Sequence, residues 1–276
     1  MKQKVWFISG CSTGFGRELA QQVLQSGDKV IATARQLSSI EDLKKHGEGN
    51  VLTLALDVTK KEQVKEAVSQ AIEVCGKVDV LVNNAGIGYF SSVEESIEEE
   101  ARKMFEVNFW GLMNLTNELL PHMRSKRDGH IINLSSIGGL ASFPSLGYYH
   151  ATKYAVEGIS ESLSQELASY NVKVTLIEPS AFRTDWGGRS SEKTVSELYS
   201  DTAGQFINDV VSSVGKEPGD PAKAAQAIIT LVNADEPPSR LLLGKIAYDV
   251  AKKKFNDLLK DIEAWKETTV SADYEK

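Results

Sequence analysis

Residues 5–24 read VWFISGCSTGFGRELAQQVL, and this stretch decides the fold. The apolar run from Val5 predicts a strand that is buried on both faces. Gly10, Gly14 and Gly16 follow, and apolar residues at helical spacing come next. A glycine-rich turn between a strand and a helix lets the backbone approach a phosphate, which then meets the free N–H groups of the helix start. A tight turn without a ligand could have the same residues. The position of these glycines after the first strand of an alternating α/β chain favours nucleotide binding.

The rest of the chain alternates strands and helices. The predicted strands are short runs rich in valine, isoleucine and leucine, at 5–9, 29–34, 51–56, 78–82, 130–134, 172–177 and 240–243. Continuous apolar strands are typical of a sheet with helices on both faces. We therefore predict an α/β fold in which residues 1–276 form a single domain. Its doubly wound, mostly parallel Rossmann sheet has about seven strands flanked by helices.

Several helices have recognisable ends. Asp220 and Pro221 predict a helix over 221–233, because aspartate is a good N-cap and proline fits the first helical turn. A second, long helix is predicted to run from Ser96 to about residue 123. Residues 249–265 carry an apolar helical stripe, so 249–276 are predicted to form a C-terminal helix and tail that pack on the body. A subunit contact in a homodimer or homotetramer is the alternative.

Residues 180–219 interrupt the alternation. The segment is too long for a plain connection between strand and helix, and it holds four aromatic residues. We predict that it folds as a cover over a substrate site.

Composition and residue spacing exclude several functional classes. The chain has 276 residues, a net charge of −7 and two cysteines. The sequence lacks the basic block interleaved with aromatics that is typical of nucleic-acid binding. Its histidines do not have the spacing of metal ligands, and no apolar run is long enough to span a membrane. We expect a soluble cytoplasmic protein without a metal.

Helical phase selects one tyrosine from GYYHATKY at 147–154. Side chains four apart lie on nearly the same face of a helix, which pairs Tyr149 with Lys153. Tyr148 and Tyr154 fall on other faces. A lysine ammonium beside the phenol is expected to lower its pKa and so to create an acid/base for a hydroxyl proton. An ordinary amphipathic helix face would be preferred if this pair stood alone.

The motifs together resemble the short-chain dehydrogenase/reductase family over roughly residues 4–185. They are the glycine turn, NNAG at 83–86, VNFWG with Asn108, INLSS at 132–136, and Tyr149 with Lys153. The branch indicated is the single-domain one that includes hydroxysteroid and retinol dehydrogenases. The resemblance implies hydride transfer between a nicotinamide cofactor and a carbonyl or alcohol, with Ser136, Tyr149, Lys153 and Asn108 as the catalytic set. Ser135 would then cap the strand end. For Asn108, stabilising a kink in the long helix is the competing role.

Arg35 decides the expected cofactor. It follows the second predicted strand, where a carboxylate would repel the 2′-phosphate of NADP(H) and an arginine would bind it. The residues expected to bind NADP(H) are Gly10, Ser12, Thr13, Gly14, Phe15, Gly16, Arg35, Asp57, Val58, Asn84, Ala85, Gly86, Tyr149, Lys153, Pro179 and Thr184. Helix capping competes with adenine binding at Asp57. Pro179 precedes Ser180 where the family has a Pro-Gly pair, a mild departure.

The expected substrate is small and apolar, because aromatic residues at 89–90 and in 180–219 would line its pocket. Two other functions remain open. One is an NADP(H)-binding sensor without turnover, although such proteins commonly lose the tyrosine or the lysine. The other is a dehydratase or epimerase of the same family, whose larger members have an added substrate domain.

Overall fold

The computed structural model describes residues 3–47, 49–188, 190–194 and 197–274, so the end of the predicted tail at 275–276 lies outside the described residues. A seven-stranded sheet has the order β3-β2-β1-β4-β6-β7-β9, and every pairing in it is parallel. Its strands are β1 (Val5–Ile8), β2 (Lys29–Ala34), β3 (Val51–Ala55), β4 (Val80–Asn83), β6 (Gly129–Leu134), β7 (Val172–Pro179) and β9 (Arg240–Leu243). The predicted doubly wound α/β fold is confirmed, with strand ends that differ from the predictions by at most two residues.

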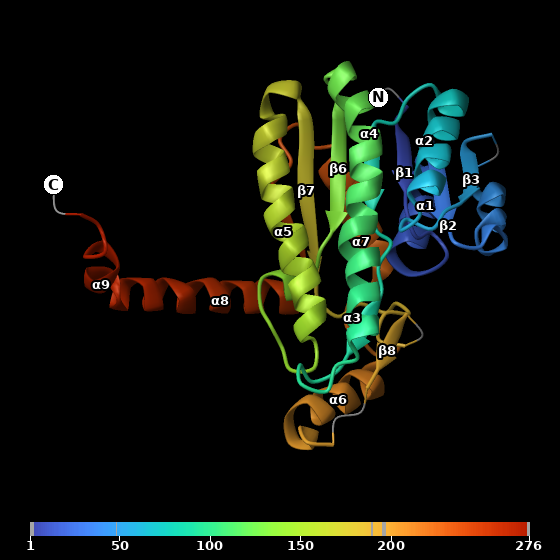
Figure 1. The fold of residues 1–276 in the computed structure, drawn as a ribbon. Coiled ribbons are helices and arrows are strands. Elements are labelled where there is room, and N and C mark those ends of the chain that lie inside the picture. The colour runs from blue at the N-terminus through green and yellow to red at the C-terminus, as the bar shows by residue number, and fades with distance from the viewer. Residues whose placement is uncertain (1–2, 48, 189, 195–196, 275–276) are drawn as a thin grey trace.

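Helices cover both faces of the sheet (Figure 1). Helices α1 (Gly14–Gln25) and α7 (Pro221–Val232) pack on one face, and α2 (Lys61–Cys75), α4 (Leu112–Lys126) and α5 (Gly147–Leu167) pack on the other. Strands β1, β4 and β6 are buried along their whole length. This double cover explains why the strands read as continuous apolar runs.

The helix predicted at 221–233 is present as α7. The side chain of Asp220 accepts a hydrogen bond from the Ala222 N–H at 2.9 Å, and Pro221 occupies the first turn, as the sequence predicts. The long helix expected from Ser96 is interrupted instead. It consists of α3 (Glu98–Phe105), a π-helical turn η3 (Glu106–Gly111) and α4.

Residues 180–219 fold into short elements beyond the carboxyl ends of the strands. They include β8 (Ser191–Lys193), a π-helical turn η6 (Ser200–Gly204) and α6 (Gln205–Ser213). Strand β8 pairs in parallel with β5 (Gly88–Phe90) to form a second, two-stranded sheet that the sequence did not predict. The remaining short helices are η1 (Leu37–Ser39), η2 (Glu41–His46), η4 (Ile137–Gly139), η5 (Ala168–Tyr170) and α9 (Lys266–Val270).

The prediction that the C-terminal stripe packs on the body is wrong for most of its length. Helix α8 (Lys245–Ala264) projects away from the rest of the molecule (Figure 1). Only Ala247 and Ala251 of this helix are buried, against residues of η4 and its loop. The stripe continues past the edge of the body, where no other part of the described chain covers it.

Candidate active site

The glycine turn lies at the point where the strand order reverses, between β1 and β4, where doubly wound sheets bind their ligands. Gly10 and Gly14 have φ of +74° and +59°, a region that residues with a Cβ rarely adopt. A Cβ on Gly16 would collide with the Gly10 carbonyl oxygen and with Nδ2 of Asn84. The turn therefore requires glycine at all three positions, for conformation at two and for close packing at the third.

The start of α1 is open to a ligand. Thr13 occupies the N-cap position but its side chain makes no capping hydrogen bond, and Ser12 beside it is half-buried. The first N–H groups of an α-helix have no partner within the helix, so a capless start leaves donors for an anion. This arrangement fits the pyrophosphate of a dinucleotide cofactor.

Asn84 supports the turn from the neighbouring strand. Its Nδ2 donates to the carbonyl oxygens of Ser9 at 2.8 Å and Gly10 at 3.0 Å, and the backbone N–H groups of Asn84 and Ala85 donate to the Ser9 hydroxyl. The next residue, Gly86, is exposed. The NNAG motif thus fixes the course of the glycine turn, because the Asn84 side chain bonds to the backbone of that turn.

Two predicted contacts lie at the ends of β2 and β3. Arg35 is exposed directly after β2, and the N–H of Cys11 in the glycine turn donates to Thr33 of the same strand at 2.8 Å. The Asp57 carboxylate accepts from the Thr59 N–H and hydroxyl, so it orders the turn before α2, whose N-cap is Lys60. Capping of the helix itself is therefore not its role. Val58 is buried, and its carbonyl oxygen accepts from Asn114.

The segment after β7 closes the other side of the glycine turn. Pro179 is the last residue of β7, and a Cβ on Gly14 would lie 3.4 Å from the Thr184 Cβ. Phe15 makes an edge-to-face contact with Phe182, with ring centroids 5.1 Å apart. The structure therefore brings the glycine turn after β1 and the segment after β7 together, as the predicted cofactor contacts require.

Tyr149 and Lys153 are both buried on one face of α5, which begins at Gly147 and so already includes the tyrosine. The Lys153 Nζ lies 5.7 Å from the centroid of the Tyr149 ring and donates to the Leu134 carbonyl oxygen at 2.7 Å. Ser136 forms a side-chain hydrogen bond with Tyr149. Tyr148 and Tyr154 are exposed, and the Tyr154 hydroxyl donates to the Leu140 carbonyl oxygen.

The expected depression of the Tyr149 pKa is not found. Burial raises the pKa of Tyr149 to about 12, and the Ser136 hydrogen bond acts in the opposite direction. Burial also lowers the pKa of Lys153 to about 8, while the nearby Glu157 carboxylate opposes that change. Removal of the phenol from water outweighs the Ser136 hydrogen bond here, so Tyr149 is a neutral proton donor near pH 7.

Asn108 lies in the π-helical turn η3, and its amide is fully engaged. Its Oδ1 accepts from the Ile87 N–H at 2.9 Å, and its Nδ2 donates to the Ile87 carbonyl oxygen at 3.0 Å and to the Thr152 hydroxyl at 3.3 Å. A π-turn carries one extra residue, and such turns are frequent at functional sites. Asn108 therefore joins the distorted helix to the strand-end loop and to α5 beside Lys153.

The capping serine is Ser136, and not Ser135 as the sequence suggested. Ser136 accepts from the Gly138 N–H at 2.9 Å and so caps η4, whereas Ser135 donates to the buried Glu157 carboxylate. Successive side chains at a strand end point to opposite sides, and here the inner side holds a carboxylate. Ser136 contacts Tyr149, and the prediction that Ser135 caps the strand end is wrong.

A partly buried charged cluster behind Lys153 is missing from the sequence predictions. The guanidinium of Arg240 pairs with Glu157, Glu161 and Glu178. Burial and the adjacent Glu157 raise the pKa of Glu178 to about 7. Glu157 follows Lys153 by four residues, so the helical spacing that selected Tyr149 could have identified this next member of the same face.

His150 was assigned no role, yet it fixes the loop at 136–146. One ring nitrogen contacts the Gly138 carbonyl oxygen at 2.9 Å, and the other accepts from the Phe143 N–H at 2.8 Å. Burial lowers the pKa of His150, which favours the neutral ring that these bonds need. The loop beside Tyr149 is thus tied to α5 at two points.

Aromatic side chains surround Tyr149. The Trp186 ring packs at 5.0 Å from Tyr149 and at 5.1 Å from Phe90, and Phe143 stacks on Phe206 with centroids 6.2 Å apart. Trp186 and Phe206 come from the 180–219 segment. The side of Tyr149 that faces this segment is therefore apolar.

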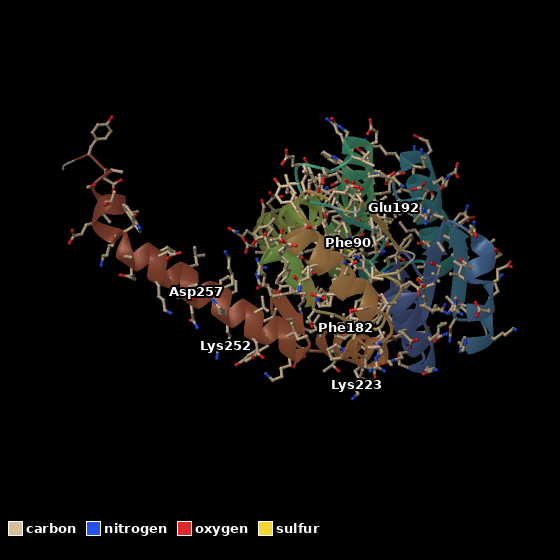
Figure 2. The ribbon with its side chains drawn as sticks, turned by 90° about the horizontal axis from the view of Figure 1, so that it is seen from below. Phe90, Phe182, Glu192, Lys223, Lys252 and Asp257 are labelled. Carbon is tan, nitrogen blue, oxygen red and sulfur yellow. The ribbon has the colours of Figure 1, made fainter. Side chains whose placement is uncertain are left out.

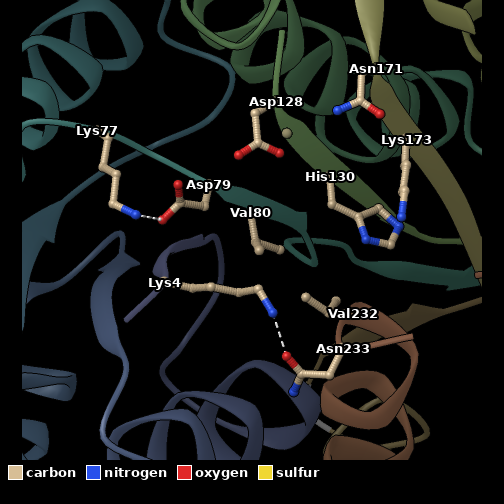
Figure 3. Close-up of a pocket in the computed structure, with 11 residues that line it drawn as sticks. Lys4, Lys77, Asp79, Val80, Asp128, His130, Asn171, Lys173, Val232 and Asn233 are labelled. Carbon is tan, nitrogen blue, oxygen red and sulfur yellow. Dashed lines mark hydrogen bonds and ion pairs between the residues drawn. The ribbon is translucent and has the colours of Figure 1, made fainter. Parts of the chain in front are cut away.

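A hollow of about 400 Å³ lies at the opposite, amino edge of the sheet (Figure 3). Its three lysines are already engaged. Lys4 donates to Asn233, Lys77 pairs with Asp79 at 2.5 Å, and Lys173 donates to the Asp235 carbonyl oxygen at 2.7 Å. None of the predicted site residues lines it.

Within the described ranges, no group of three or more metal-binding side chains is present. In the same part of the chain, no helix has the length and apolarity needed to cross a bilayer.

Comparison with known proteins agrees with this geometry. Residues 4–195 match the family model for short chain dehydrogenases. The chain is 39% identical to oxidoreductase BOA17 of Botryotinia fuckeliana over 98% of its own length and 99% of the relative's. It is 35% identical to human retinol dehydrogenase 8, with 84% of this chain and 79% of that protein covered.

A crystallised short-chain dehydrogenase from Streptomyces avermitilis superposes with a TM-score of 0.93 at 36% identity, covering 99% of this chain and all of that one. The chain therefore belongs to the short-chain dehydrogenase/reductase family. It is a Rossmann-fold oxidoreductase that works with a nicotinamide cofactor on a small-molecule substrate.

Proposed function

We propose that the chain transfers a hydride between NADP(H) and the carbonyl or alcohol group of a small apolar substrate. Ser136, Tyr149, Lys153 and Asn108 form the proposed catalytic set. The observation that carries this proposal is the placement of Tyr149 and Lys153 on one buried face of α5, next to Ser136 and at the edge of the sheet where the glycine turn opens.

Tyr149 is the proposed proton donor in the direction of carbonyl reduction. NADPH, when bound, supplies the hydride to the carbonyl carbon. The Tyr149 hydroxyl gives its proton to the carbonyl oxygen, which becomes the alcohol, and the phenolate then regains a proton from solvent. A pKa of about 12 keeps the hydroxyl protonated before the reaction. Ser136 donates a hydrogen bond to the same oxygen and stabilises the charge that develops there.

Lys153 and Asn108 support this proton transfer. An ammonium near the ring stabilises the phenolate only after the proton has left, which is a contribution specific to the reaction rather than to the resting site. With a pKa of about 8, Lys153 is mostly charged at neutral pH. Its bond to the Leu134 carbonyl oxygen fixes the amine at the end of β6, and Asn108 holds the neighbouring Thr152 in place. By resemblance, Lys153 also binds the nicotinamide ribose.

Arg35 is the basis of the proposed preference for NADP(H). It is exposed at the end of β2, next to the glycine turn, and its two predecessors in the strand are uncharged. A guanidinium binds the 2′-phosphate of NADP(H) by charge-assisted hydrogen bonds, whereas NAD(H) has only a neutral hydroxyl at this position.

The aromatic surroundings of Tyr149 support an apolar substrate. Trp186, Phe90 and the stacked pair of Phe143 and Phe206 leave few polar groups to bind a sugar or polyol. We propose that residues 180–219 cover the substrate, because they supply Trp186 and Phe206 to this wall and are joined to β5 through β8.

A substrate panel tests the proposal. Purified protein is mixed with NADPH or NADH and a series of aliphatic, aromatic and steroid-like carbonyl compounds, and oxidation of the cofactor is followed by absorbance. We expect turnover with NADPH and with apolar carbonyls. Tight binding of NADPH without turnover of any carbonyl, or of any alcohol with NADP, would instead indicate a sensor.

A further inference from the structure

Helix α8 extends away from the body of the molecule (Figure 2), and the rest of the described chain leaves its apolar stripe uncovered. Its exposed apolar residues follow Ala247 and Ala251 on one face at helical spacing; they are Phe255, Leu258, Leu259 and Ile262, with Trp265 directly after the helix. The exposed fractions of the first four lie between 45% and 58%. A water-exposed stripe of this kind marks a contact surface.

Beyond Ala251, the charged residues of α8 fall into two groups. On the face away from the stripe, Lys253 and Lys260 both pair with Asp257. At the flanks of the stripe, by contrast, Lys254, Asp261 and Glu263 form no ion pair with any residue that the structure describes. The fourth flanking charge, Lys252, contacts the Tyr248 hydroxyl. The charges that border the stripe are therefore available to a partner.

We infer that the stripe of α8 binds the same stripe of a second copy of this chain, with the two helices antiparallel. The argument is charge complementarity. In such a pair, each flank faces the identical flank of the other copy. Lys252 and Glu263 lie on one flank, and Lys254 and Asp261 lie on the other, at about 100° per residue.

A two-fold axis between Leu258 and Leu259 gives both the apolar and the charged residues suitable partners. Phe255 then lies opposite the partner's Ile262, and Leu258 lies opposite the partner's Leu259. In the same register, Lys252 is within two residues, or about 3 Å along the axis, of the partner's Glu263. Lys254 has the same offset from the partner's Asp261. One register therefore pairs apolar residues with apolar residues and each lysine with an acid.

The length of α8 fits this arrangement. In the same register the partner's Ala264, the last residue of its helix, lies opposite Lys253. The body of the first copy begins at Ala251, the last residue of the stripe that is buried against η4 and its loop. The partner's helix thus covers the exposed part of the stripe and ends where the body of the first copy starts.

Cysteine cross-linking tests the register. In a Cys75→Ser background, Leu258→Cys places two thiols within about 1.5 Å of each other along the axis of the paired helices. Mild oxidation is expected to give a covalent dimer on a non-reducing gel. Lys260→Cys, on the opposite face, is the matched control and is expected to remain monomeric on the gel. Equal cross-linking of the two variants would overturn the proposal.

Light scattering after size exclusion tests the assembly itself. The wild-type mass is expected at an even multiple of 30.2 kDa, and Leu258→Glu is expected to halve it. Lys254→Glu should weaken the dimer, and the double variant with Asp261→Lys should restore it, because each reversed charge meets its reversed partner. A monomeric wild type would refute the proposal. So would an unchanged mass for Leu258→Glu, or a monomer that sediments with phosphatidylcholine vesicles only when Leu258 is intact.

Discussion

Lys153 and Lys173 lie at opposite edges of the same sheet and have different surroundings. Lys153 donates to the last residue of β6 and is buried beside Tyr149, at the same edge of the sheet as the glycine turn. Lys173, near the start of β7, donates to a loop carbonyl oxygen beside a hollow whose other lysines are also engaged (Figure 3). Parallel strands place loops at both edges, but the carboxyl edge alone combines an open helix start with an acid/base pair. The open helix start and the acid/base pair, rather than a hollow, therefore mark the proposed site.

The largest expected effect comes from removing the lysine at the carboxyl edge. Lys153→Met should lower kcat about 10²- to 10⁴-fold, the range that a general acid/base system contributes, and should raise the KM for NADPH. The matched change at the amino edge, Lys173→Met, should leave both constants within about twofold. Steady-state kinetics of both variants with one carbonyl substrate measure this contrast. Similar losses in the two variants would remove the distinction between the edges.

The same lysine predicts a pH dependence. Lys153 is protonated below its pKa of about 8, so carbonyl reduction should decline as the pH rises through that value. The neutral Tyr149, with its higher pKa, remains a proton donor over the same interval. The measurement is kcat from pH 6 to 10. A rate that rises through this interval would mean that the lysine does not support proton transfer.

Arg35→Asp should have the next largest effect. Loss of a charge-assisted bond to a phosphate costs about 1.5–3 kcal/mol, and the new carboxylate adds repulsion. NADPH should therefore bind at least about tenfold more weakly, while NADH binding changes little. Fluorescence titration of both cofactors gives the ratio, with Arg183→Asp as the control because Arg183 is bonded to the Glu217 carbonyl oxygen away from β2. An unchanged ratio would assign the preference to other residues.

His130 at the amino edge should affect stability rather than activity. Burial, together with Lys173 and Lys4, lowers its pKa to about 4, against 6.5 for a free histidine. As the pH falls from 6.5 to 4, the unfolded chain gains a proton that the folded chain does not, so the free energy of unfolding decreases by roughly 1.4 kcal/mol per unit of pKa difference. Urea unfolding should show a steeper loss for wild type than for His130→Gln. Parallel pH profiles would contradict this assignment.

Asp79→Asn at the same edge should produce the smallest change. The half-exposed pair with Lys77 contributes about 0–1 kcal/mol, and an asparagine oxygen can still accept from the Val5 N–H. We expect a small decrease in the free energy of unfolding and no change in kcat. A tenfold loss of activity would show that the two edges are coupled.

Local patterns predicted most of the fold and the pairing of Tyr149 with Lys153. The apolar runs, the Asp220 cap and the glycine turn depend on neighbours in sequence. The helical phase of α5 correctly placed Tyr149 on the same face as Lys153, where both side chains are buried. What the sequence missed depends on distant contacts. Strand β5 exists because it pairs with β8, about a hundred residues later, and the π-turn is held by bonds from Asn108 to Ile87.

Burial was the second source of error. The raised pKa of Tyr149 reflects removal of the phenol from water, which no spacing rule reports. The Arg240 cluster likewise joins acids from α5 and β7 to a strand that follows them in sequence. For α8, the pattern identified an apolar stripe correctly but could not tell whether the body extended far enough to cover it.

Single-turnover hydride transfer tests the central proposal, that Tyr149 delivers the proton, most directly. Wild type, Tyr149→Phe and Tyr154→Phe are each loaded with NADPH and mixed rapidly with a carbonyl substrate that wild type reduces. Tyr149→Phe is expected to bind NADPH as wild type does and to transfer hydride about 10²- to 10⁴-fold more slowly. Tyr154→Phe, which loses only a surface bond to Leu140, is expected to match wild type. Wild-type transfer by Tyr149→Phe would contradict the account.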